Sequence, residues 1–204
     1  MGVESSGERE TNRLEAFSDG VFAFAITILV LGLRDPVSNG STSLFQSLLS
    51  EWPTFFAFVT SFATELIMWM NHHNMFNYIR RVDREFMLLN GLLLFFVTLT
   101  PFTTSLVADH ILSGDAKTAT VAYSGGFLLL SLAWNVLWRY ASSGHRLLGK
   151  HVSPGQVTGI TRQYYVAPLF YSIALLASFF SALASLVTIL LVASFYGITA
   201  TMSE

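Results

Sequence analysis

Cysteine is absent from the 204 residues of the chain, which excludes disulfide bonds, thiolate metal sites and cysteine nucleophiles together. Charge is scarce as well, because Asp, Glu, Lys and Arg make up 12% of the residues, against roughly 25% in soluble domains. The net charge of -2 offers no basic surface for nucleic acid. Hydrophobic residues reach 52%, more apolar surface than a soluble chain of this length can bury. The composition predicts a protein of the lipid bilayer that binds no nucleic acid.

Long apolar stretches between charged residues are the second feature. A spanning helix needs about 20 mostly apolar residues, and six stretches meet this requirement. They predict transmembrane helices over residues 13–33, 44–77, 83–109, 117–141, 160–181 and 184–201. Residues 142–161 read as a loop, and no repeat or linker divides the chain. We therefore expect an all-α integral membrane protein with one six-helix domain over residues 1–204.

The basic residues are unevenly divided between the two sides of these six helices. Only Arg34 and Lys117 fall on one side. The other side receives Arg9, Arg13, Arg80, Arg81, Arg84, Arg139, Arg146, Lys150 and Arg162. Because cytoplasmic loops accumulate Lys and Arg, this asymmetry predicts that both termini are cytoplasmic. Six crossings are an even number, which independently places both termini on the same side of the membrane.

A few polar residues fall at membrane depth, where they are costly unless paired or wetted. At a rise of about 1.5 Å per residue, Asp19 lies about 9 Å inward from the basic edge and His72 about 12 Å. Trp69 shares one helix stripe with His72. We predict a hydrogen-bonded cluster in the inner leaflet, made of Arg13, Ser18, Asp19, Trp69 and His72. The alternative is that Asp19 starts a helix and the histidines lie at the headgroups.

The first predicted helix also carries a bulky apolar stripe. Phe24, Ile28 and Leu31 are spaced i, i+4 and i+7 and therefore share a face, with Thr27 beside it. Asp19 lies about 140° around the helix from Phe24, so the polar side and the apolar side are distinct. Such a stripe more often faces lipid or a protein core than a pore, and periodicity alone does not decide between them.

Three sequence blocks, taken together, resemble the transmembrane protein 175 family of potassium channels. The first is the stretch RLEAFSD over residues 13–19, an Arg, three residues and then Phe-Ser-Asp. The second is WMNHHNMF over residues 69–76, and Asn90 followed by TPFT at residues 100–103 forms the third. The resemblance extends over roughly residues 13–104. It implies a six-helix prokaryotic protein of the plasma membrane that assembles as a homotetramer.

The resemblance implies a potassium-permeable cation channel without a cofactor, whose pore is lined by the first helix of each subunit. The constriction positions of the family fall on Phe24, Ile28 and Leu31, with a Thr layer at Thr27, and Phe24 stands where Ile or Leu is common. The residues implied to hold this helix are Arg13, Phe17, Ser18, Asp19, Trp69, His72 and Asn90. The chain lacks the Thr-Val-Gly-Tyr-Gly filter signature. A hydrophobic constriction that gates by dewetting, with modest preference for potassium over sodium, is therefore expected.

Two other classes of function compete with a channel. A membrane enzyme is disfavoured because His72 and His73 are adjacent and point about 100° apart, and no metalloprotease or hydrolase motif is present. A proton- or cation-coupled secondary carrier is the stronger alternative, since intramembrane Asp, Glu and His can relay protons. A carrier saturates and couples to protons, whereas a pore gives single-channel steps. A purely structural membrane scaffold also stays open.

Overall fold

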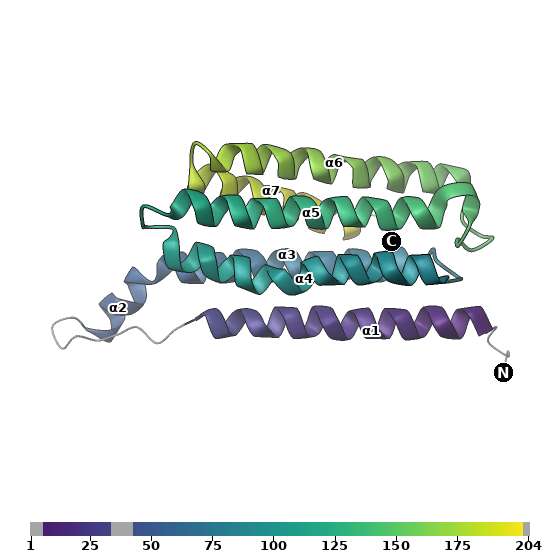
Figure 1. The fold of residues 1–204 in the computed structure, drawn as a ribbon, viewed down its shortest axis with the longest axis horizontal. Coiled ribbons are helices and arrows are strands. Elements are labelled where there is room, and N and C mark those ends of the chain that lie inside the picture. The colour runs from purple at the N-terminus through teal and green to yellow at the C-terminus, as the bar shows by residue number, and fades with distance from the viewer. Residues whose placement is uncertain (1–5, 34–42, 202–204) are drawn as a thin grey trace.

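The computed structural model describes residues 6–33 and 43–201, and this part of the chain is built from helices. Figure 1 shows the helices as one elongated bundle. The elements are α1 (Ser6–Ile28), the 3-10 turn η1 (Leu29–Gly32), α2 (Leu44–Ser50), α3 (Trp52–Phe76), α4 (Arg84–His110), α5 (Ala116–Ser142), the 3-10 turn η2 (Ser143–His145), α6 (Pro154–Ser178) and α7 (Ala182–Thr201). The all-α prediction is confirmed. By length and apolar composition, α1 with η1, α3, α4 and α5 can each cross a membrane.

Three helix boundaries differ from the predicted ranges. The first helix begins at Ser6 instead of residue 13. The predicted range 44–77 divides into α2 and α3, because Pro53 occupies the first turn of a new helix, where its missing N–H does no harm. The helix expected from residue 160 begins at Pro154. Its start is fixed by a capping box, in which Ser153 and Gln156 satisfy each other's backbone N–H groups.

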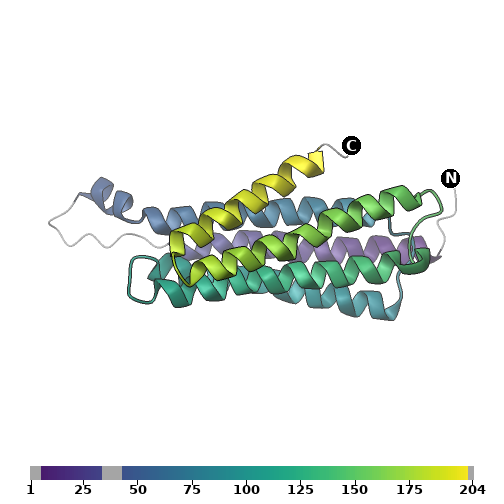
Figure 2. The same cartoon turned by 90° about the horizontal axis from the view of Figure 1, so that it is seen from above.

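The long helices run antiparallel in chain order, so the connections alternate between the two ends of the bundle (Figure 1). The N-terminal end carries the connections 77–83 and 143–153, and the opposite end carries 111–115 and 179–181. α1 lies at one edge of the bundle against α3 and α4. In the second view, α7 crosses α6 obliquely (Figure 2). The position of α1 leaves one of its sides uncovered by its own subunit.

The packed interior lies where α5 contacts α4 and α6. The large side chains of Trp138, Tyr123, Phe86, Leu93 and Leu130 are fully buried there. Half of the most apolar window of α5 is buried, against 22% of the corresponding window of α1. α5 is therefore the central helix of the subunit and α1 the peripheral one.

Candidate functional site

The two faces of α1 differ in what covers them. Ser18, Phe22, Ala25 and Leu29 repeat at helical spacing and are buried against the subunit. The opposite face carries the residues expected to form the constriction. On this face the Phe24 side chain is 64% exposed and Leu31 75%, Thr27 is exposed, and Ile28 is half-buried. Phe17, at 62% exposure, belongs to the same side. The structure thus leaves Phe24, Thr27 and Leu31 largely uncovered by their own subunit, whereas Ile28 is half-buried, and Ile28 and Leu31 border a hollow against α3 and α4.

A chain of buried hydrogen bonds holds the covered face of α1. Ser18 Oγ donates to the Leu14 carbonyl at 2.9 Å and accepts from Asn90 Nδ2 at 2.9 Å. Asn90 Oδ1 lies 3.0 Å from His72 Nε2. Because an amide oxygen only accepts, His72 Nε2 donates, and Nδ1 is the buried ring nitrogen without a partner. Ser18, Asn90 and His72 are each fully buried, so this chain joins α1, α4 and α3 out of reach of water.

A second contact between α1 and α3 lies beside that chain. Trp69 Nε1 donates to Asp19 Oδ1 at 2.9 Å. One helical turn away on both helices, His73 Nδ1 lies 2.8 Å from Glu15 Oε1, and its ring stacks on Trp69 with centroids 6.3 Å apart. In the described part of the chain, Arg13 is exposed and no hydrogen bond or ion pair joins it to Asp19. The structure therefore brings together four members of the predicted cluster and leaves out Arg13.

The Glu15–His73 pair was missed by the sequence analysis, although the sequence contains a signal for it. On two antiparallel helices, a step of four residues back on one matches a step of four residues forward on the other. Applying that step to Asp19 and Trp69 leads to Glu15 and His73. Pairing the two helices in register would have found both contacts together.

A further polar layer crosses the middle of the subunit. Ser61 Oγ lies 2.7 Å from Thr104 Oγ1 and 2.8 Å from the Tyr123 hydroxyl, so it links α3, α4 and α5. Glu65, one turn further along α3, is fully buried next to Thr100 of α4, and within the described residues no hydrogen bond of good geometry reaches its carboxyl oxygens. This layer lies in the interior and is separate from the exposed face of α1.

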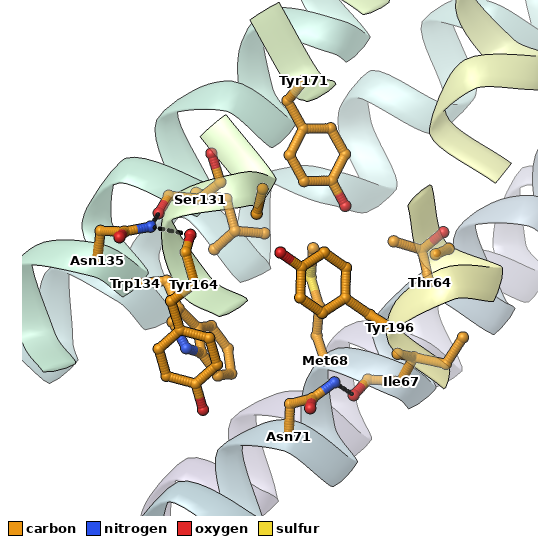
Figure 3. Close-up of a pocket in the computed structure, with 13 residues that line it drawn as sticks. Thr64, Ile67, Met68, Asn71, Ser131, Trp134, Asn135, Tyr164, Tyr171 and Tyr196 are labelled. Carbon is orange, nitrogen blue, oxygen red and sulfur yellow. Dashed lines mark hydrogen bonds between the residues drawn. The ribbon is translucent and has the colours of Figure 1, made fainter. Parts of the chain in front are cut away.

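Within residues 6–33 and 43–201, no group of three or more His, Asp or Glu side chains is placed to hold a metal ion. A pocket of about 60 Å³ lies between α3, α5, α6 and α7, and Figure 3 shows Tyr171 and Tyr196 bordering it. Asn135 and Asn71 line it, but their amides donate to backbone carbonyls. Among the described residues, its lining includes no charged side chain and none of the predicted pore residues, so this pocket lies apart from the exposed face of α1.

Comparisons with known proteins agree on one family. The model of a family described as the endosomal/lysosomal potassium channel TMEM175 matches residues 13–101. A potassium channel of Chamaesiphon minutus is 44% identical over 181 residues, covering 88% of this chain and 89% of the relative. A potassium channel of Streptomyces collinus is 35% identical over 189 residues, covering 92% of each. A crystal structure of a lysosomal potassium-selective channel TMEM175 homolog from Chamaesiphon minutus superposes with a TM-score of 0.86 at 40% identity, covering 94% of this chain and 98% of that one.

Proposed function

Because the chain belongs to the TMEM175 family of potassium channels, we propose that its ion path is a hydrophobic pore formed by the exposed face of α1. The assembly is a homotetramer, as the sequence resemblance implies, and one copy of α1 from each subunit lines the central axis. Phe24, Ile28 and Leu31 form the constriction and Thr27 adds a hydroxyl layer. The pore conducts monovalent cations with a modest preference for potassium over sodium.

The observation that carries this proposal is the orientation of α1 in the subunit. Its polar side is bound to α3 and α4 through Ser18 and Asp19, while its bulky apolar side is left open. In a closed symmetric assembly, each subunit presents the same surface to a common axis. α1 lies at the edge of the bundle, so four copies can meet there without rearranging the subunit interior.

The constriction controls conduction by how well it holds water. It does not use a cage of backbone carbonyls. A narrow ring of apolar side chains holds water poorly, and an ion must shed hydration to enter it, so a small widening opens the path. Thr27 Oγ1 donates its proton to the Phe24 carbonyl at 2.8 Å. The oxygen lone pairs are then free to replace part of the lost hydration of a cation. Potassium dehydrates more cheaply than sodium, which gives the modest preference.

Hydrogen bonds behind the pore keep α1 in this orientation. The Ser18–Asn90–His72 chain and the Asp19–Trp69 bond connect α1 to two different helices. Rotation of α1 would leave these buried groups without partners, which is costly at membrane depth. The residues that resemble the family signature thus act as positioning residues, whereas the apolar stripe contacts the ion path.

The topology we propose has six crossings, with both termini in the cytoplasm and the channel in the cell membrane. α6 and α7 serve as the fifth and sixth spans. α6 runs along the bundle (Figure 1), and α7 crosses it obliquely (Figure 2), as a tilted span does. The connections 77–83 and 143–153 and the N-terminal end of α1 lie at one end. Most of the basic residues fall at that end, as the positive-inside rule requires of the cytoplasmic side.

Currents from purified protein in a planar bilayer, with asymmetric KCl and NaCl, test this function. We expect unitary cation currents whose reversal potential shows a modest preference for potassium. Saturating flux coupled to protons without unitary steps would indicate a secondary carrier. The absence of current at every voltage would contradict the channel.

A further inference from the structure

The two connections at the N-terminal end of the bundle are joined to each other by backbone hydrogen bonds. Ile79 and Leu148 form an isolated antiparallel bridge. On either side of it, Arg80 N donates to the Leu147 carbonyl at 3.0 Å and Gly149 N donates to the Tyr78 carbonyl at 2.9 Å. Ile79, Leu147 and Leu148 are buried, so this junction is anchored in the protein core.

Four exposed basic side chains lie in or next to these two connections and form no ion pair in the described part of the chain. We call them the basic platform: Arg80, Arg81, Arg84 and Lys150. The antiparallel pairing brings residues 80–81 from one connection close to residues 147–150 from the other. Gly149 allows the approach, because a Cβ atom there would lie 3.0 Å from Arg80 Cγ and 2.5 Å from the His151 ring. The platform is therefore assembled from two segments far apart in the sequence.

The acidic residue Asp83, which lies between Arg81 and Arg84 in the sequence, is already engaged. Asp83 Oδ1 accepts from the Phe86 backbone N–H at the start of α4. Its Oδ2 accepts from the Tyr140 hydroxyl at 2.8 Å and lies 3.5 Å from Arg146 Nε. Glu85 is exposed but forms no ion pair with a platform residue in the described part of the chain. The platform thus retains positive charge that the subunit does not neutralise.

Aromatic residues at this end of the bundle support a position of the platform at the level of lipid headgroups. Trp and Tyr are enriched where helices leave the bilayer, and α5 and α6 carry such residues at this end. Arg139 lies over the Tyr165 ring at 4.4 Å and Arg146 over the Tyr140 ring at 4.8 Å. Arg84 is the first residue of α4, so its charge lies where that helix begins.

We propose that the basic platform binds the phosphodiester headgroups of anionic phospholipids in the inner leaflet. Basic pockets on the cytoplasmic side of helix bundles suit such headgroups, and each Lys or Arg near the surface contributes attraction that salt weakens. The partner is a lipid because the platform lies beside the aromatic belt and not on a domain that projects into water.

Thermal unfolding of the full-length protein in detergent, titrated with lipid, tests this binding without depending on ion conduction. A ligand that binds the folded state raises the unfolding midpoint. We expect phosphatidylglycerol to raise it more than phosphatidylcholine with the same acyl chains, and the difference to shrink as KCl is increased. In the variant Arg80→Gln/Arg81→Gln/Lys150→Gln, the apparent affinity for phosphatidylglycerol should fall on the order of 100-fold.

Three controls keep the proposal falsifiable. Lys117→Gln removes an exposed basic residue at the opposite end of the bundle and should leave the phosphatidylglycerol response unchanged. Lys150→Gln alone should lower the apparent affinity for phosphatidylglycerol about fivefold. This single variant provides the test if the triple variant does not fold. Inorganic phosphate should give no comparable shift. Equal responses to the two lipids, an unaffected triple variant or a full response to phosphate would each overturn the proposal.

Discussion

Asn90 is the side chain on which the position of α1 depends most. Its amide donates to Ser18 on one side and accepts from His72 on the other, and all three residues are fully buried. Removing one partner from such a chain leaves the remaining polar groups without water or protein partners, which costs more than the bond itself contributes. Asp19 has a different role, since it is half-buried and is bound by a single indole N–H.

We predict that Asn90→Ala destabilises the subunit by about 2–4 kcal/mol, because Ser18 and His72 both lose a buried hydrogen bond. The unfolding midpoint in detergent measures the change. Asn77→Ala is the matched control, since Asn77 is exposed at the end of α3, and it should have little effect. Equal midpoints for the two variants would show that the Ser18–Asn90–His72 chain does not stabilise α1.

The contacts of α1 with α3 and α4 could be predicted only in part from helical spacing. Depth and periodicity placed Asp19, Trp69 and His72 together, because antiparallel helices bring residues of equal depth to one level. They also included Arg13, which the structure leaves exposed. Depth fixes the level of a side chain but not its direction, and direction depends on which face of α1 packs on α3 and α4.

Among the helices, α1 has two distinct sides. One side binds α3 and α4, and the other is left uncovered by the subunit. The stripe of Phe24, Ile28 and Leu31 was evident from spacing, but its exposure in the subunit was not, since an apolar stripe is equally compatible with a core. The helix boundaries were harder to predict from the sequence. The start of α6 at Pro154 was readable from the Ser153–Gln156 capping box. The predicted start at residue 160 instead follows the charge of Arg162, which marks the end of the apolar stretch.

Shortening the side chains of the stripe should change conduction without dissolving the assembly. We expect Ile28→Ala and Leu31→Ala to alter unitary conductance or the ratio of potassium to sodium permeability, because a wider ring holds water more readily. Neither side chain is part of the packed interior of the subunit, so both variants should elute from gel filtration like the wild-type protein. Leu88→Ala, on an exposed part of α4 at 66% exposure, is the control. Unchanged currents from both stripe variants would remove α1 from the pore.

At the scale of the whole molecule, composition and charge asymmetry were the most informative signals. The low charge content predicted membrane insertion, and α1, α3, α4 and α5 have the length and apolar character to span it. The placement of basic residues also predicts which end of the bundle faces the cytoplasm. Tertiary features that depend on two segments meeting, such as the bridge between Ile79 and Leu148, lie beyond single-sequence patterns, because no local propensity encodes them.

The proposed orientation can be tested with the help of the missing cysteines, since each introduced cysteine is then the only thiol. Ser181→Cys lies in the exposed connection between α6 and α7, and Arg81→Cys lies in the exposed connection between α3 and α4. In intact cells, a membrane-impermeant maleimide should label the variant at residue 181 alone. The variant at residue 81 should react only after permeabilisation. The reverse pattern would invert the orientation.

Cysteine modification under current recording can show whether the open face of α1 lines the ion path. A positively charged methanethiosulfonate reagent is applied to bilayers containing Leu31→Cys or Leu88→Cys, and mass spectrometry confirms that each thiol has reacted. We expect modification at residue 31 to reduce the unitary cation current, because a fixed positive charge then lies in the constriction. Modification at residue 88 should leave the current unchanged. Complete modification at residue 31 with an unaltered current would contradict the account.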